Sequence, residues 1–146
     1  MNKGLVILLL ILAGTFVSLQ ASINARLAKY IGFLEAAFVS FLVGTVTLMI
    51  LILFRGENNL KSIVEVPIIY LTGGILGALF VFSITYAIHI VGVTGTLAIS
   101  ISVQLLIGLL LDTFDPMKVI KLNISMYNVI GVLLVILGVF LILLRK

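Results

Sequence analysis

The sequence predicts an all-α membrane protein with five transmembrane helices, and its composition and charge-free runs support this prediction. Of the 146 residues, 63% are hydrophobic and 10% are charged, whereas a soluble domain usually carries about 25% charged residues. Lys3 is followed by no charged residue until Arg26, and Glu65 by no Asp, Glu, Lys or Arg until Asp112. A helix crosses a bilayer core with about 20 apolar residues. The second run is about twice that length, and the turn-like segment 92–95 lies near its middle.

The five helices are expected where the chain is free of charge and is bounded by polar or turn-forming residues. They cover residues 4–28, 34–54, 67–90, 94–111 and 125–144, all within a single integral membrane domain of residues 1–146. The first helix is aliphatic and becomes polar in its last third, and the turn 30–33 leads into the second. The polar loop 55–59 precedes the third helix, which Pro67 is well suited to begin. The segment 112–116 separates the fourth helix from the fifth.

The residue types that are missing exclude several classes of function. The chain has no cysteine, which excludes disulfides, thiolate metal sites and cysteine nucleophiles. The sequence shows no paired carboxylates, metal-ligand cluster or Ser/His/Asp arrangement, so we expect neither an enzyme nor a metal or cofactor. Lys and Arg are scattered at helix ends without a basic stripe, which indicates membrane anchoring and no binding of nucleic acid. The apolar N-terminal run continues to Ala25, so we expect an uncleaved first span.

The distribution of positive charge between the two membrane sides bears on orientation. With five helices, one side carries Lys3, Arg55, Lys61, Lys118 and Lys121, and the other carries Arg26, Lys29, Arg145 and Lys146. Orientation follows the Lys/Arg asymmetry, and here the asymmetry is almost nil. Either a partner or a few dominant charges fix one orientation, or the protein inserts both ways and pairs with an inverted copy of itself. Such an antiparallel pair is the unfused equivalent of an inverted-repeat transporter.

Polar residues within the expected spans are candidates for a solute cavity. In the fourth helix Ser100 and Gln104 share a face, and Gln104 lies near the middle of its span. A central amide in hydrocarbon needs a partner, so Gln104 either forms an interhelical hydrogen bond or lines a cavity. Gln20 and Asn24 share a face of the first helix, and the nearby serines favour a polar cavity or a gate.

Charged residues and glycines near the helix ends have both structural and functional interpretations. An ionisable residue inside a membrane is a functional candidate, yet Glu35 could also form an interfacial ion pair with Arg26 or Lys29. His89 is expected at the same interface. Asp112 ends the fourth helix, where a carboxylate opposes the helix dipole. We take Arg26, Glu35 and Asp112 as gating or anchoring charges.

Small residues at regular spacing predict close helix packing. Gly73 and Gly77 give a small-xxx-small pattern in the third helix. Gly131 and Gly138 belong to a similar seam in the fifth helix, which suits contact between protomers.

Several segments resemble the YdcZ family of the drug/metabolite transporter superfamily. The similar segments are residues 20–27, 37–45 and 73–80, and Gln104 followed by residues 109–112. The resemblance implies a five-helix protein of the bacterial inner (plasma) membrane and an exporter, related to ten-helix transporters built as inverted halves. The chain resembles the small multidrug resistance proteins more distantly. Those proteins carry a glutamate in helix 1, where this chain has Gln20 and Asn24 and no acid.

These observations together predict a small-molecule transporter that acts as an antiparallel homodimer of dual topology by alternating access. Its cavity would be lined by Gln20, Asn24, Ser100 and Gln104, which would bind a small polar or amphipathic solute. The lipid bilayer and a second, inverted copy are the expected partners. Two alternatives stay open: a non-transporting membrane assembly subunit, and one half of an obligate heterodimer with a paralogous five-helix protein.

Overall fold

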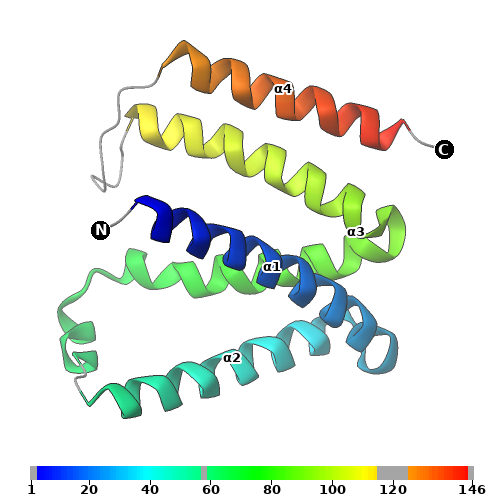
Figure 1. Cartoon of the computed structure of the whole chain (residues 1–146). Coiled ribbons are helices and arrows are strands. Elements are labelled where there is room, and N and C mark those ends of the chain that lie inside the picture. Colours follow the sequence, from blue (N-terminus) through cyan, green and yellow to red (C-terminus); the bar gives the residue numbers. More distant parts are fainter. Residues whose placement is uncertain (1–2, 57–58, 115–124, 145–146) are drawn as a thin grey trace. The chain divides into compact units, whose positions relative to one another are not determined.

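The protein is all-α, as the sequence predicts. The computed structural model describes residues 3–56, 59–114 and 125–144. Within these ranges four helices are long and apolar enough to cross a membrane (Figure 1). They are α1 (Lys3–Ile31), α2 (Phe33–Arg55), α3 (Gly73–Phe114) and α4 (Met126–Leu143). Lys118, Lys121, Arg145 and Lys146, which enter the orientation count, lie outside the described residues.

The difference between the expected five helices and the four observed ones lies at Gly92. This residue has φ 81° and ψ 168° inside α3, so it breaks the helix without a loop. Glycine tolerates this backbone because it lacks a Cβ. The expected turn at 92–95 is therefore a single residue. With α3 divided at Gly92, the described part of the chain contains five helical segments long enough to be compared with the predicted spans.

The approach to α3 differs from the expected start at Pro67. Two 3-10 helices, η1 (Leu60–Glu65) and η2 (Ile68–Thr72), occupy this region, and α3 begins at Gly73. Pro67 has ψ 132° and caps η2, where its carbonyl accepts a hydrogen bond of 3.0 Å from the Tyr70 amide. Val66 is extended, which is the conformation that a following proline favours. The proline therefore begins a tight 3-10 turn here.

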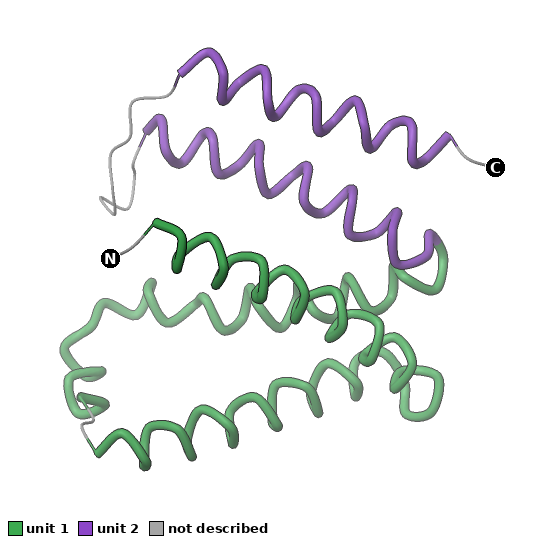
Figure 2. The backbone as a smooth tube through the Cα atoms, viewed as in Figure 1, with its two compact units in different colours: residues 1–90 green, residues 91–146 purple. Residues whose placement is uncertain are grey.

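The chain divides into two compact units, residues 1–90 and 91–146 (Figure 2). Unit 1 holds α1, α2 and the first part of α3. Unit 2 holds the rest of α3 and α4. Within unit 2 a Cβ built on Gly95 would lie 3.5 Å from Leu143 Cδ2, so the start of one helical segment meets the end of the other. The two segments of unit 2 are therefore antiparallel.

Unit 1 is built around an antiparallel hairpin of α1 and α2 that turns at Gly32. Gly32 has φ 99° and ψ 162°. Its amide donates to the Ala28 carbonyl at 2.9 Å, and its carbonyl accepts from the Ala36 amide at 3.1 Å. The residues buried along the hairpin are mostly alanines: Ala21, Ala25, Ala28, Ala36 and Ala37. Small side chains allow the close backbone approach by which membrane helices pack.

The first part of α3 completes unit 1 by packing against both helices of the hairpin. Phe33 of α2 meets Tyr86 edge to face, with ring centroids 5.1 Å apart. A Cβ built on Gly77 would lie 3.1 Å from Phe41 Cζ. The first residue of α2 thus meets a later residue of α3 than Phe41 does, so α2 and the first part of α3 are antiparallel. The three segments of unit 1 run up, down and up, as successive membrane spans must.

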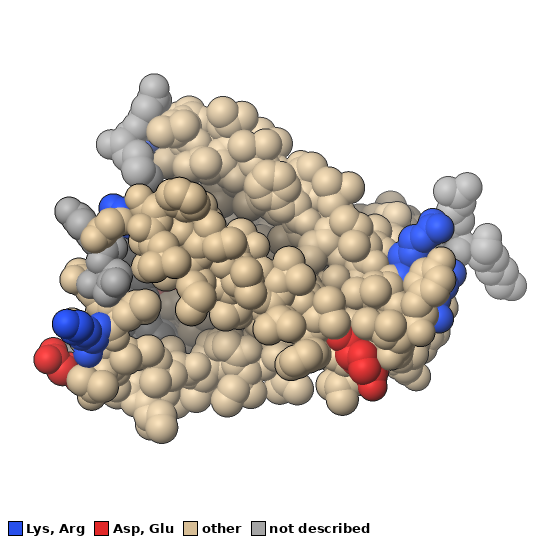
Figure 3. All heavy atoms as spheres, turned by 90° about the horizontal axis from the view of Figure 1, so that it is seen from below, with Lys and Arg blue, Asp and Glu red and all other residues tan. Residues whose placement is uncertain are grey.

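The surface of unit 1 matches a membrane environment. Large apolar side chains project outward along the helices; Leu10, for example, is 66% exposed. Figure 3 shows Lys, Arg, Asp and Glu gathered toward the two ends of the face in view, with uncharged atoms between. Lys3 and Arg55 lie at the hairpin end opposite Gly32. Soluble proteins rarely expose so much contiguous apolar surface to water. The surface of these helices therefore suits contact with lipid.

Candidate functional site

Most hydroxyl groups of α1 are satisfied within their own helix. Thr15, Ser18 and Ser22 each donate to the carbonyl four residues earlier, at 2.9, 3.0 and 3.1 Å. This back-bonding lets a hydroxyl enter hydrocarbon without another partner. The amides of Gln20 and Asn24 have no such bond within α1, so they are the groups of this polar stretch that act outside their helix.

The two amides of α1 converge on one hydroxyl of α2. Asn24 Nδ2 donates to Ser40 Oγ at 3.2 Å, and Gln20 Nε2 donates to the same oxygen at 3.4 Å. Asn24 is only 5% exposed, although it lies in the charge-free part of α1. The sequence analysis placed Gln20 and Asn24 on one helix face but did not identify Ser40 as their partner. The signal was present, because Asn24 and Ser40 each lie eight residues from the Gly32 turn.

Thr85 is a second residue that the sequence did not single out. It is fully buried, and within the described part of the chain its hydroxyl has no hydrogen-bond partner. It lies with Gln20 and Asn24 around a small cavity of about 10 Å³, whose remaining lining is apolar. That volume is at the lower limit for holding one water molecule. Unit 1 therefore contains a compact polar cluster, which we call the amide cluster: Gln20, Asn24, Ser40 and Thr85.

Ser100 and Gln104 form a separate pair in unit 2. Gln104 Nε2 donates to Ser100 Oγ at 2.7 Å along the same helix. This bond lies within one helix, and the choice between an interhelical bond and a cavity-lining role for Gln104 stays a prediction. The hydroxyls of Thr96 and Ser102 nearby are buried and have no partner within the described ranges. The common cavity of α1 and the second part of α3 stays a prediction.

The three charged candidates are all exposed in the structure. Among the described residues Glu35 forms no ion pair with Arg26 or Lys29. Its carboxylate instead lies beside Gly32, where an added Cβ would collide with it. Asp112 is exposed near the end of α3. The lysines considered as its partners, Lys118 and Lys121, lie outside the described residues.

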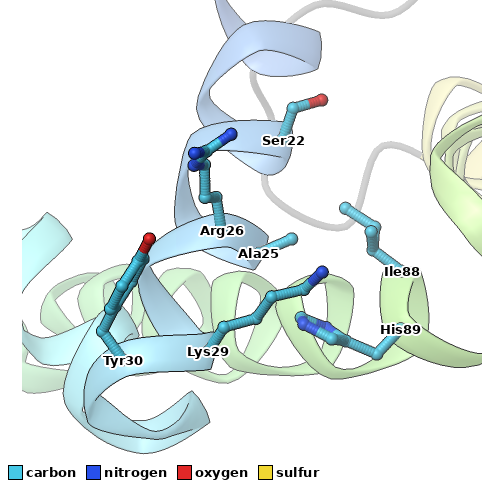
Figure 4. A pocket seen from close by; sticks show the side chains of 7 residues that line it. All are labelled: Ser22, Ala25, Arg26, Lys29, Tyr30, Ile88 and His89. Carbon is cyan, nitrogen blue, oxygen red and sulfur yellow. The ribbon is translucent and has the colours of Figure 1, made fainter.

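A larger cavity of about 740 Å³ lies at the Gly32 end of unit 1 (Figure 4). Its lining is Ser22, Ala25, Arg26, Lys29, Tyr30, Ile88 and His89. The first five come from the last turns of α1, and Ile88 and His89 come from α3. His89 Nδ1 lies 3.0 Å from the Thr85 carbonyl oxygen, and its ring meets Phe33 edge to face at 4.9 Å. These contacts orient the imidazole, and within the described part of the chain its Nε2 has no hydrogen-bond partner. We call this space the cationic cavity.

The glycines chosen as packing residues differ in their surroundings. A Cβ built on Gly77 would lie 3.1 Å from Cζ of Phe41, so this glycine faces a side chain of another helix. A Cβ on Gly73, Gly131 or Gly138 would meet nothing within 4 Å. These three glycines therefore leave open surface on the single chain, and their role in contact between protomers stays a prediction.

Comparison with protein families decides where this chain belongs. Residues 5–141 match a family model described as "Putative inner membrane exporter, YdcZ". The chain belongs to the YdcZ family. This confirms the resemblance carried by its helices. Comparisons with curated proteins and with solved structures gave no match.

Membership in the YdcZ family agrees with the physical features of the site. The chain is an inner-membrane protein of a transporter family of the drug/metabolite type, and is not an enzyme. Residues 3–56, 59–114 and 125–144 contain no group of three His, Cys, Asp or Glu that could hold a metal ion.

Proposed function

We propose that this YdcZ protein exports a small polar or amphipathic solute as an antiparallel homodimer of dual topology. The cavity would be lined by α1 and the second part of α3 from both protomers. Gln20, Asn24, Ser100 and Gln104 would bind the solute by hydrogen bonds. The observation that carries the proposal is the convergence of the Gln20 and Asn24 amides on Ser40 in a charge-free part of the hairpin.

The chemistry of the amide cluster supports solute binding. Each amide uses an N–H on Ser40, which leaves its carbonyl oxygen and second N–H for another partner. The unpartnered hydroxyl of Thr85 lies at the same small cavity. Polar groups at membrane depth are tolerated where they are paired or line a water-filled space. Neutral donors and acceptors suit an uncharged or zwitterionic solute.

The surfaces left open by the single chain support a second copy as partner. No residue of α4 is buried, and Gly131 and Gly138 of this helix face open space. Small residues on an open helix face favour helix–helix contact in membranes. The near-equal Lys/Arg count supports insertion in both orientations, which an antiparallel homodimer requires. Near the membrane surfaces, Arg26, Glu35 and Asp112 would be gating or anchoring charges.

The proposal is tested first at Gln104 with the cysteine-free background of the chain. Gln104→Cys should react with a water-soluble thiol reagent in membranes, because a cavity that alternates between the two sides admits water. The matched control is Leu106→Cys, whose side chain is 40% exposed on the same helix and is expected to face lipid. Equal protection of both cysteines in every condition would contradict a water-filled cavity at Gln104.

The second part of the test measures export. Efflux of a panel of polar and amphipathic solutes is compared between cells expressing the chain and cells expressing Gln104→Leu. We expect the leucine variant to lose export while dimer stability stays within roughly 1 kcal/mol, because interhelical polar contacts in membranes average about 0.6 kcal/mol. Weaker dimers, with export that follows the amount of dimer, would assign Gln104 a structural role only.

A further inference from the structure

We propose that the cationic cavity of unit 1 binds an oxyanion group, a phosphate or carboxylate, that carries an apolar substituent. This site is separate from the amide cluster. The inference concerns binding to the single chain, so it does not depend on the homodimer or on export.

The first argument is uncompensated positive charge. Arg26 and Lys29 lie three residues apart on the last turns of α1, and both line the cavity. No Asp or Glu belongs to its lining, and within the described ranges neither cation forms an ion pair. Two like charges on one helix face repel each other. An anion between them would remove that repulsion and gain attraction to both.

The second argument is the arrangement of donors around a space of suitable size. Figure 4 shows the Lys29 side chain extending toward His89, while the Arg26 side chain extends along α1 toward the level of Ser22. The volume of about 740 Å³ is within the range of small-molecule pockets, about 300–1,000 Å³. Arg offers a planar fork of donors to an oxyanion, and Lys a compact charge. Both groups therefore suit phosphate or carboxylate oxygens.

The third argument is the mixed polarity of the lining. Ala25 and Ile88 give the cavity an apolar wall, and the Tyr30 ring adds an aromatic surface. Ser22 already donates its hydroxyl hydrogen to the Ser18 carbonyl, so it can only accept. A ligand that is an oxyanion at one end and apolar at the other fits this lining. Such a ligand can be a free amphiphilic solute or the headgroup of an anionic lipid.

Interfacial anchoring is the competing explanation. Cations near a helix C-terminus complement its dipole, and long basic side chains reach toward the headgroup region. Anchoring requires only charge at this height in the membrane. It does not require His89 and Ile88 of α3 to close a cavity with them. The experiment therefore compares this cation pair with an equal pair elsewhere on the same unit.

The test uses phenyl phosphate as probe and the full chain in nanodiscs of phosphatidylcholine. We expect saturable binding by equilibrium dialysis, weakened about tenfold or more in Arg26→Gln/Lys29→Gln because two attractive charges are lost. The matched control, Arg55→Gln/Lys61→Gln, removes the same charge at the opposite end of the hairpin and should bind as the parent does. Equal affinity in both double variants would overturn the proposal.

A second measurement separates a free solute from a lipid source. Ser22→Cys is labelled with an anionic methanethiosulfonate in nanodiscs with and without phosphatidylglycerol. Slower labelling with phosphatidylglycerol, together with weaker phenyl phosphate binding, assigns the site to a lipid headgroup. Phenyl phosphate binding that phosphatidylglycerol leaves unchanged assigns it to a free solute. If phenyl phosphate does not bind and phosphatidylglycerol has no effect, Arg26 and Lys29 serve only as interfacial anchors. That result would overturn the proposal.

Discussion

At the scale of single residues, Ser40 is the side chain that links α1 and α2 by hydrogen bonds. Its hydroxyl oxygen accepts from both Gln20 and Asn24, so one small side chain binds one N–H of each of two amides of another helix. Removing an acceptor leaves a buried donor unsatisfied, which costs about 1–3 kcal/mol. Asn24 is the buried member of the pair, so the cost falls mainly there.

We therefore predict that Ser40→Ala lowers the free energy of unfolding by about 1–2 kcal/mol. The measurement is thermal or denaturant unfolding of the purified chain in detergent. Ser18→Ala is the matched control, because the Ser18 hydroxyl bonds only to a carbonyl of its own helix. A Ser40 variant as stable as the Ser18 variant would show that the amides find other partners.

Thr85 presents the opposite case, a buried hydroxyl without a partner in the described structure. Replacing this hydroxyl by a methyl group of similar size removes a buried polar atom that forms no hydrogen bond within the described residues. Thr85→Val should therefore keep the free energy of unfolding unchanged or raise it by up to about 1 kcal/mol. Thermal unfolding measures this as an unchanged or higher midpoint. Thr47→Val is the control, because the Thr47 hydroxyl donates a hydrogen bond to the Val43 carbonyl. A clear loss of stability in Thr85→Val alone would mean that this hydroxyl is bonded in the membrane-embedded protein.

At the scale of elements, Gly77 marks the contact of α3 with α2. A Cβ at this position would be 3.1 Å from Phe41 Cζ, so a larger side chain must displace the Phe41 ring or move the two helices apart. We predict that Gly77→Leu reduces the folded yield in detergent and lowers stability by about 1–3 kcal/mol. Gly74→Leu is the control, since a Cβ there meets nothing within 4 Å. Similar behaviour of the two variants would contradict the close packing of α3 on α2.

The helices could be located from the sequence because charge exclusion from hydrocarbon acts on the chain directly. Their ends depend on local backbone chemistry, and here the sequence was less informative. Pro67 begins a 3-10 turn, so α3 begins at Gly73, and Gly92 needs only one residue to break the helix. The span between Glu65 and Asp112 is therefore one broken helix preceded by a 3-10 turn.

The candidate site was predictable only where one helix sufficed. Gln20 and Asn24 share a face by their spacing alone. Ser40 lies on another helix and was not predicted, although it is as far from the Gly32 turn as Asn24 is. Thr85 could not be found in this way, because its position beside them depends on how α3 packs on the hairpin. The same reason explains why the cationic cavity was not predicted from Arg26 and Lys29.

At the scale of the whole molecule, the near-even distribution of Lys and Arg governs insertion. A reporter fused to the C-terminus should be found on both membrane sides at comparable levels, because the positive-inside signal is almost balanced. Adding two or three lysines to the loop after α2 should shift the reporter to one side and reduce dimer formation by the protein expressed alone. A one-sided signal from a functional fusion would exclude the homodimer and favour a paralogous partner of fixed orientation.

The single-residue joint at Gly32 limits how this protein can move. One residue spans about 3.8 Å, less than the 5.4 Å of one helical turn, so α1 and α2 have no slack to slide past each other. The two helices can therefore change their angle at Gly32 but not their register. In the described chain the other glycines of positive φ are Gly56 and Gly92. The alternating access proposed above would therefore need a change of angle at one of these three glycines, or a rotation between protomers, without a change in the register of α1 and α2.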